Sequence, residues 1–163
     1  MRDDIGPAAT HRDGATAQAG VIYTIGFTRR TAADFFGALR VAGIARVVDV
    51  RLNNASQFAG FTKRQDLPFF LHELCGAGYI HERLLAPTAD LLAAYRRTRS
   101  WDDYARAFAD LLAERRVEAR LDPAHFAGPT ALLCTEPTPE RCHRRLVAEH
   151  LAAAWGGLEI VHL

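Results

Sequence analysis

Two short β-branched runs on either side of a helical pattern constrain the fold of this chain more than any other feature. Residues 21–25 read Val-Ile-Tyr-Thr-Ile and end at Gly26, as a buried strand does. Residues 46–51 are apolar at their centre on both faces, which is typical of a strand covered by helices on each side. Between the two runs, Thr31 and Gly43 bound a segment with apolar residues at helical spacing. A strand, a helix and a strand with short connections predict a parallel βαβ unit.

The rest of the chain continues this alternation. Residues 53–60 form a polar loop of the kind that covers a site. Thr138 and Pro139 are predicted to be the N-cap and first residue of a helix that runs to about residue 154. Apolar periodicity predicts further helices over residues 63–75, 89–96 and 101–116, and strands over residues 79–81, 129–134 and 158–163. We therefore expect an α/β fold, a single three-layer domain over residues 20–163 with a mainly parallel sheet flanked by helices.

Composition limits the partners that the chain can have. The formal net charge is +1 over 163 residues, so the whole chain does not attract nucleic acid or membranes electrostatically. No stretch has the about 18–20 apolar residues of a membrane span, and no membrane partner is expected. Residues 1–19 lack apolar periodicity, and we predict a flexible leader there. The three cysteines show no disulfide-framework spacing, which favours free thiols in the cytoplasm.

Residues 134–145 hold the densest group of reactive side chains. Cys134 stands at the exit of a predicted strand and faces the start of a helix, where free amide donors and the helix dipole favour a thiolate. Cys142, His143 and Arg144 fall in the first turns of that helix. A cysteine beside a histidine and an arginine could be a nucleophile, one half of a redox pair, or part of a metal site.

A purely structural interpretation of the same segment is also open. Cysteine is a common small core residue at strand ends. Arg144 could pair with the carboxylate of Glu136, or with that of Glu140 one helical turn away. Under that interpretation the segment would carry no chemistry.

Two further groups lie at the ends of the predicted strands. Asp49 and Arg51 are two residues apart in a strand, so their side chains share a face. They could orient a substrate or act in acid–base chemistry, or they could form an internal salt bridge between strand and loop. Gly26, Thr28 and Arg29 form a strand-to-helix joint that suits a phosphate or carboxylate.

Lys63 could add positive charge from the covering loop, together with Arg64 beside it. Solvated charges at a helix start are the simpler and favoured explanation of these two residues. Zinc would need three or four ligands, of which Cys134, Cys142 and His143 could supply up to three. Adjacent helical residues point about 100° apart, which argues against a shared site for Cys142 and His143, and we predict no metal ligand.

Four blocks in this order resemble the Domain of Unknown Function 488 family over residues 21–163. They are residues 23–26, residues 48–51, residues 60–63, and residues 133–136 with 142–144. Residues 159–163 also resemble the closing strand of that family. The resemblance implies a small α/β enzyme. The suspected site residues that it implies here are Cys134, Glu136, Cys142, His143, Arg144, Asp49 and Arg51.

The chain departs from the family pattern in two loops. The family shows prolines and serines after its Asp-Val-Arg step, whereas residues 52–57 read Leu-Asn-Asn-Ala-Ser-Gln. The family also has a Leu-Gly-Gly step where residues 84–87 read Leu-Leu-Ala-Pro. Both loops are expected to cover the site, so the departures concern the substrate more than the fold.

The leading hypothesis is an enzyme that acts on a small anionic substrate, for which a nucleotide is one candidate. Cys134 would be the thiolate, Cys142 its resolving or supporting partner, and His143 the proton carrier. Glu136 or Asp49 would orient the histidine or a substrate hydroxyl. The anion would be held by Arg144, Arg51 and Arg29. The sequence specifies neither a cofactor nor an oligomeric state.

Two alternatives belong to other classes of protein. One is a nucleic-acid-binding or regulatory module, which the near-neutral net charge does not favour. Its basic face would consist of Arg29, Arg30, Lys63, Arg64, Arg141, Arg144 and Arg145. The other is a structural zinc domain built on the cysteines.

Overall fold

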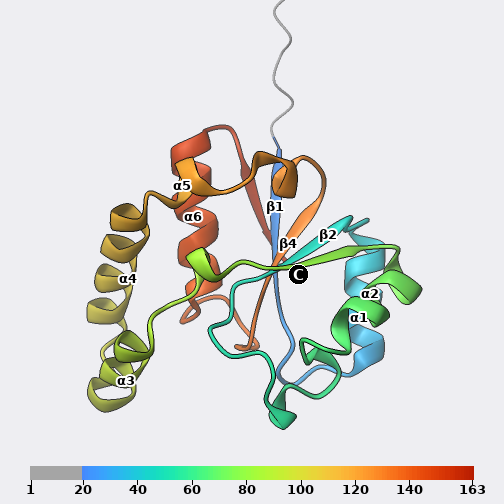
Figure 1. Cartoon of the computed structure of the whole chain (residues 1–163), viewed down its shortest axis with the longest axis horizontal. Coiled ribbons are helices and arrows are strands. Elements are labelled where there is room, and N and C mark those ends of the chain that lie inside the picture. Colours follow the sequence, from blue (N-terminus) through green and yellow to red (C-terminus); the bar gives the residue numbers. More distant parts are fainter. Residues whose placement is uncertain (1–19) are drawn as a thin grey trace, which may run out of the picture.

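Five parallel strands form one sheet in the order β3-β2-β4-β1-β5. The computed structural model describes residues 20–163 (Figure 1). The strands are β1 (Val21–Gly26), β2 (Arg46–Asp49), β3 (Gly78–His81), β4 (Thr130–Cys134) and β5 (Glu159–His162). Because all five strands run the same way, their carboxyl ends meet at one edge of the sheet, at the lower end of the molecule in Figure 1.

Helices cover both faces of the sheet, which confirms the predicted three-layer α/β fold (Figure 1). One face carries α1 (Ala32–Val41) and α2 (Leu67–Cys75). The other face carries α3 (Ala89–Thr98), α4 (Trp101–Arg115), α5 (Val117–Arg120) and α6 (His143–Trp155). Short 3₁₀ turns complete the connections, namely η1 (Gln57–Thr62), η2 (Arg83–Leu85) and η3 (Pro123–Phe126).

Alternate strand residues feed two separate cores. Val47 packs with Phe35 on the α1 side, whereas Val48 packs with Phe108 and Leu132 on the α4 and α6 side. Neighbouring residues of a strand point to opposite faces, so β2 and β4 must be apolar at successive positions. Each fully buried side chain of this size stabilises the fold by about 1.5–3 kcal/mol.

Two helices begin later than the sequence predicts. Cys142, and not Thr138, is the N-cap of α6. The N–H of Cys142 donates to the carbonyl of Pro139 at 3.2 Å, so residues 139–142 close a turn before the helix begins. Helix α2 begins at Leu67 instead of residue 63, because η1 occupies part of the predicted polar loop and the backbone is extended at residue 63.

The predicted leader at residues 1–19 lies outside the described residues. In the part of the chain that the structure describes, no helix has both the length and the apolar character required to cross a bilayer.

Candidate functional site

A cavity of about 370 Å³ lies beyond the carboxyl end of β4. One wall comes from the end of β4 and the start of α6, and includes Cys134, Cys142 and His143. The opposite wall comes from α3 and the first turn of α4. The cavity therefore lies at the carboxyl edge of the sheet, where ligands bind in open parallel α/β folds.

Cys134 and His143 are in contact at the cavity wall. Cys134 is the last residue of β4, and its Sγ lies 3.5 Å from Nδ1 of His143. The Nε2 atom of His143 lies 2.8 Å from the carbonyl oxygen of Val50. A carbonyl oxygen only accepts hydrogen bonds, so Nε2 carries the proton and donates. The ring therefore presents the lone pair of Nδ1 to the Cys134 sulfur, and burial lowers the pKa of His143, which favours its neutral form.

The surroundings of Cys134 favour its thiolate form. Burial alone raises the pKa of this thiol, but four groups outweigh burial and hold the pKa below its ordinary value. They are the Cys142 thiol, the N–H groups of Thr135 and Glu136, and the positive charge of Arg144. The pKa of Cys142 is raised, first through its hydrogen bond with Cys134 and then through burial. Cys142 therefore keeps its proton and donates to the Cys134 sulfur.

Arg144 is a buried cation whose charge is felt by the Cys134 thiol. It is 1% exposed, and its Nη1 donates to the backbone oxygen of Glu136 at 2.6 Å. Its Nε lies 3.3 Å from Oγ1 of Thr24. Among residues 20–163, no carboxylate forms an ion pair with Arg144. Glu136 and Glu140, the partners in the purely structural interpretation, do not bind it through their carboxylates, and its charge helps to lower the pKa of Cys134.

Gly26 allows the loop after Cys134 to lie against β1. A Cβ atom on Gly26 would lie 1.8 Å from the backbone oxygen of Glu136 and 2.9 Å from Nη1 of Arg144. The N–H of Thr28 donates to the Thr135 carbonyl at 3.2 Å, which holds the same loop. Gly26 and Thr28 thus position the loop and do not line the cavity.

Asp49 and Arg51 have the geometry of the internal salt bridge that the sequence left open. Nε of Arg51 lies 2.8 Å from Oδ1 of Asp49, and Nη2 lies 2.7 Å from Oδ2. Arg51 also donates to the hydroxyl and the carbonyl of Thr62, which fastens η1 to the end of β2. Asn54 and Tyr79 donate to Asp49 as well. Burial raises the pKa of Asp49, but these partners, Arg51 above all, hold it below its ordinary value.

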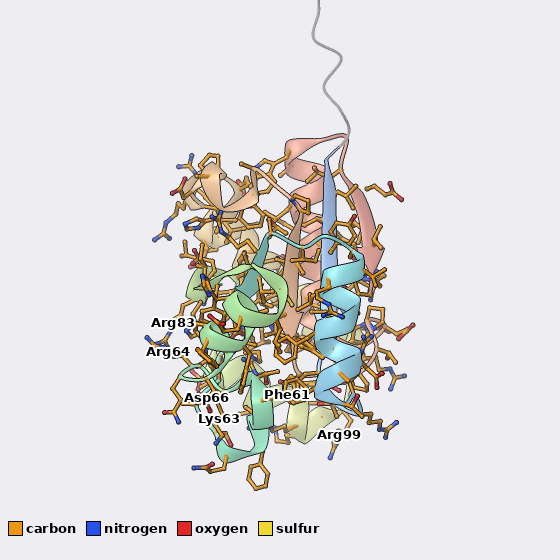
Figure 2. All side chains as sticks on the ribbon, turned by 90° about the vertical axis from the view of Figure 1, so that its right-hand side faces the viewer. Phe61, Lys63, Arg64, Asp66, Arg83 and Arg99 are labelled. Atoms are coloured by element: carbon orange, nitrogen blue, oxygen red, sulfur yellow. The ribbon has the colours of Figure 1, made fainter. Side chains whose placement is uncertain are left out.

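The structure brings together part of the predicted site. The cavity is lined by Cys134, Glu136, Cys142, His143 and Arg51. Asp49 and Arg144 are buried and do not line it. Arg29 and Lys63 also lie outside its lining, and Figure 2 shows Lys63 near the lower edge of the molecule. Because Arg144 is buried, it is unable to contribute to the basic face expected for a nucleic-acid-binding module.

The sequence interpretation missed the opposite wall of the cavity. Trp101 and Tyr104 fall within the helix predicted over residues 101–116 and are not among the predicted site residues, yet both line the cavity together with Tyr95. The wall also carries Arg96 and Arg99. The cluster of arginines just before Trp101 is a signal that could have indicated an anion site at this joint between two helices.

Three possible metal ligands converge in the same wall. The sulfur atoms of Cys134 and Cys142 and a ring nitrogen of His143 lie within 4.8 Å of one another. The angular argument against a shared site does not apply, because Cys142 is an extended N-cap residue with φ −131° and ψ 134°. Sulfur and imidazole ligands suit zinc. Three donors beside a cavity match the catalytic type of zinc site, which keeps one position open, and not the four-ligand structural type.

These features define a class of protein: a three-layer parallel α/β domain with a cysteine pair and a histidine at the carboxyl edge of its sheet. Residues 31–151 match the family model described as Domain of unknown function DUF488. The chain belongs to this family, as its sequence motifs indicated. Neither the curated proteins nor the solved structures contain a match to the chain.

Proposed function

We propose that this protein is a cytoplasmic enzyme that uses the Cys134 thiolate on a small anionic substrate. One observation carries the proposal: Cys134 lines a cavity while its sulfur contacts Nδ1 of His143 at 3.5 Å. A cysteine beside a histidine in the wall of a cavity is the arrangement of an activated thiol nucleophile. A reducing compartment would keep this thiol and its neighbour Cys142 free.

The residues of the wall can be assigned to the steps of nucleophilic catalysis. His143 takes the proton of Cys134, and the resulting thiolate attacks an electrophilic atom of the substrate. The new bond to sulfur forms as the bond to the leaving group breaks, and the leaving group takes its proton from His143. Water then releases the product from the sulfur. Cys142 donates its hydrogen bond to the Cys134 sulfur while that sulfur is a thiolate, before the attack and after product release, which is consistent with the raised pKa of Cys142.

The charges around the cavity support an anionic substrate. Arg96, Arg99 and Arg141 line the cavity, and no salt bridge within residues 20–163 engages them. Arg51 lines it too, but its charge is balanced by Asp49. Glu136 is the only carboxylate among the described lining residues. The excess of guanidinium groups favours phosphate or carboxylate, which arginine binds through paired hydrogen bonds.

Two measurements test this proposal. Iodoacetamide at neutral pH should label Cys134 before Cys75, which lies on the other face of the sheet and whose pKa is raised by burial. Equal or slower labelling of Cys134 would contradict an activated thiol. Turnover should then be sought with nucleoside monophosphates, sugar phosphates and small carboxylates. We expect Cys134→Ser to lose it by a factor of about 10² or more, and Cys75→Ser to keep it.

A second candidate function follows from the three converging donors. Cys134, Cys142 and His143 could hold a zinc ion with one position open to the cavity. The metal would then activate a bound water or a substrate oxygen. Metal analysis of gently purified protein decides between the candidates, since about one equivalent of zinc, lost in Cys142→Ala, would support the metal site. Metal-free protein with a reactive Cys134 would instead support the thiol enzyme.

A further inference from the structure

The wall of the cavity opposite the thiols combines aromatic rings with arginines. The ring centroids of Tyr95 and Trp101 are 6.0 Å apart, and Tyr104 lies 4.9 Å from Tyr95 and 5.3 Å from Trp101. Tyr95 and Trp101 are only half-buried and line the cavity. Aromatic faces in the wall of a cavity offer a platform for a nucleobase, because every base has a π-face that can stack.

Exposed guanidinium groups flank these rings. Arg96 lies on α3 and Arg99 is its C-cap residue, so both stand where α3 joins α4. Figure 2 shows Arg99 near the lower end of the molecule, the end at which the strands finish. Arg141 reaches the same cavity from the loop before α6. The cavity thus has aromatic rings on one wall, with arginines both on that wall and on the loop before α6. The rings suit a nucleobase, and the arginines suit a phosphate.

We propose that this cavity binds a nucleoside monophosphate, with the base on Tyr95 and Trp101 and the phosphate among Arg96, Arg99 and Arg141. The inference rests on the proposed function, because it names the substrate class for the same cavity. A volume of about 370 Å³ lies near the small end of the range for ligand sites. That size favours a free mononucleotide over a nucleic-acid strand.

The chain offers a direct optical probe of this wall. It has two tryptophans, and Trp155 lines a separate cavity at the other end of β1. Trp155→Phe therefore leaves Trp101 as the only fluorophore of its kind. We expect AMP, GMP, CMP or UMP to quench Trp101 with saturation. Ribose 5-phosphate lacks the base and adenosine lacks the phosphate, so each should bind at least tenfold more weakly than AMP.

Arginine variants in the Trp155→Phe protein test the phosphate contacts. Arg99→Ala should weaken AMP binding about tenfold and leave adenosine binding unchanged. Arg97→Ala is the matched control, since Arg97 is an exposed arginine of α3 that does not line the cavity. Equal binding of AMP and ribose 5-phosphate, or AMP binding insensitive to Arg99→Ala, would overturn the proposal. Tighter binding of a short oligonucleotide than of any mononucleotide would overturn it as well.

The same titration separates this proposal from the catalytic one. Cys134→Ala should bind AMP within about twofold of the parent protein, because the thiol is not part of the recognition wall. Saturable binding together with an ordinary, unreactive Cys134 would uphold the nucleotide site and reject the thiol enzyme. A reactive Cys134 with no quenching by any of the four mononucleotides at millimolar concentration would reject the nucleotide site alone.

Discussion

Of the groups that lower the pKa of Cys134, the neighbouring thiol of Cys142 has the largest effect. Cys142 donates to the Cys134 sulfur and so lowers the pKa of that thiol. Cys142→Ala removes the donor, so the pKa of Cys134 should rise and its alkylation by iodoacetamide should require a higher pH. The measurement is the labelling rate of Cys134 against pH, followed by mass spectrometry of its peptide. Cys75→Ala is the control, and an unchanged profile in Cys142→Ala would refute the assignment of the donor.

A single glycine determines whether the loop after Cys134 can reach its place. Gly26→Ala would put a methyl group 1.8 Å from the backbone oxygen of Glu136, so the loop must move. We expect a loss of about 1–3 kcal/mol in the free energy of unfolding, measured in urea, and slower labelling of Cys134. Gly37→Ala is the matched control, because nothing lies within 4 Å of its added Cβ in α1. It should stabilise the fold by about 0.5–1 kcal/mol. A neutral Gly26→Ala would show that the loop is not held against β1.

The joint between β2 and η1 depends on one buried ion pair. Asp49→Asn would leave Arg51 buried without its counter-charge, which should cost about 3–5 kcal/mol of unfolding free energy at neutral pH. Asp103→Asn is the control, since it removes only the exposed pair with Arg106 and should change stability by less than about 1 kcal/mol. Comparable effects of the two substitutions would contradict the role given to the buried pair.

The same pair predicts how this difference depends on pH. The pKa of Asp49 is lower in the fold than its ordinary value, so the unfolded chain binds its proton first on acidification. The contribution of Asp49 is complete above the ordinary carboxyl pKa of about 4 and is lost as pH falls through the folded value. The free energies of unfolding of wild type and Asp49→Asn, measured in urea, should therefore differ by a constant amount near neutral pH and become similar in acid.

Secondary structure was readable from the sequence because its causes are local. The β-branched runs gave β1 and β2, and the apolar spacing gave α4, since each signal lies within one element. The predicted start of α6 was wrong. The Thr138-Pro139 pair is typical of a helix start, but here residues 139–142 form a turn that is closed by the hydrogen bond from the Cys142 N–H to the Pro139 carbonyl. Because Cys142 precedes the helix, the helical angle of about 100° between adjacent residues does not apply to Cys142 and His143.

The cavity as a whole was less predictable than the elements around it. Its thiol wall was found, because Cys134, Cys142 and His143 are close together in the sequence. Its aromatic wall was missed, because Tyr95 and Trp101 share a cavity with the thiols only through the packing of α3 and α4 in the fold. The sequence also placed Arg144 against the substrate anion, whereas it is buried. Burial of a cation depends on tertiary contacts that the sequence does not show.

The two cores of the molecule should contribute alike to stability but differently to chemistry. Phe35 and Phe108 are both fully buried, one on each face of the sheet. Only Phe108 contacts the site, with its ring centroid 5.5 Å from that of His143 in an edge-to-face arrangement. Both cores share one sheet, so Phe35→Leu and Phe108→Leu should have similar effects on stability. Each should lower the free energy of unfolding by about 1–2 kcal/mol, which is measured as a lower urea midpoint.

The labelling of Cys134 should separate the two variants in the folded protein. Loss of the Phe108 ring leaves the His143 imidazole less firmly held, so it takes the proton of Cys134 less readily and labelling moves to higher pH. Phe35→Leu changes only the far core and should leave the labelling profile as it is in wild type. If both variants shifted the profile equally, the reactivity of Cys134 would follow global stability, and the placement of His143 by the α4 side of the molecule would have to be abandoned.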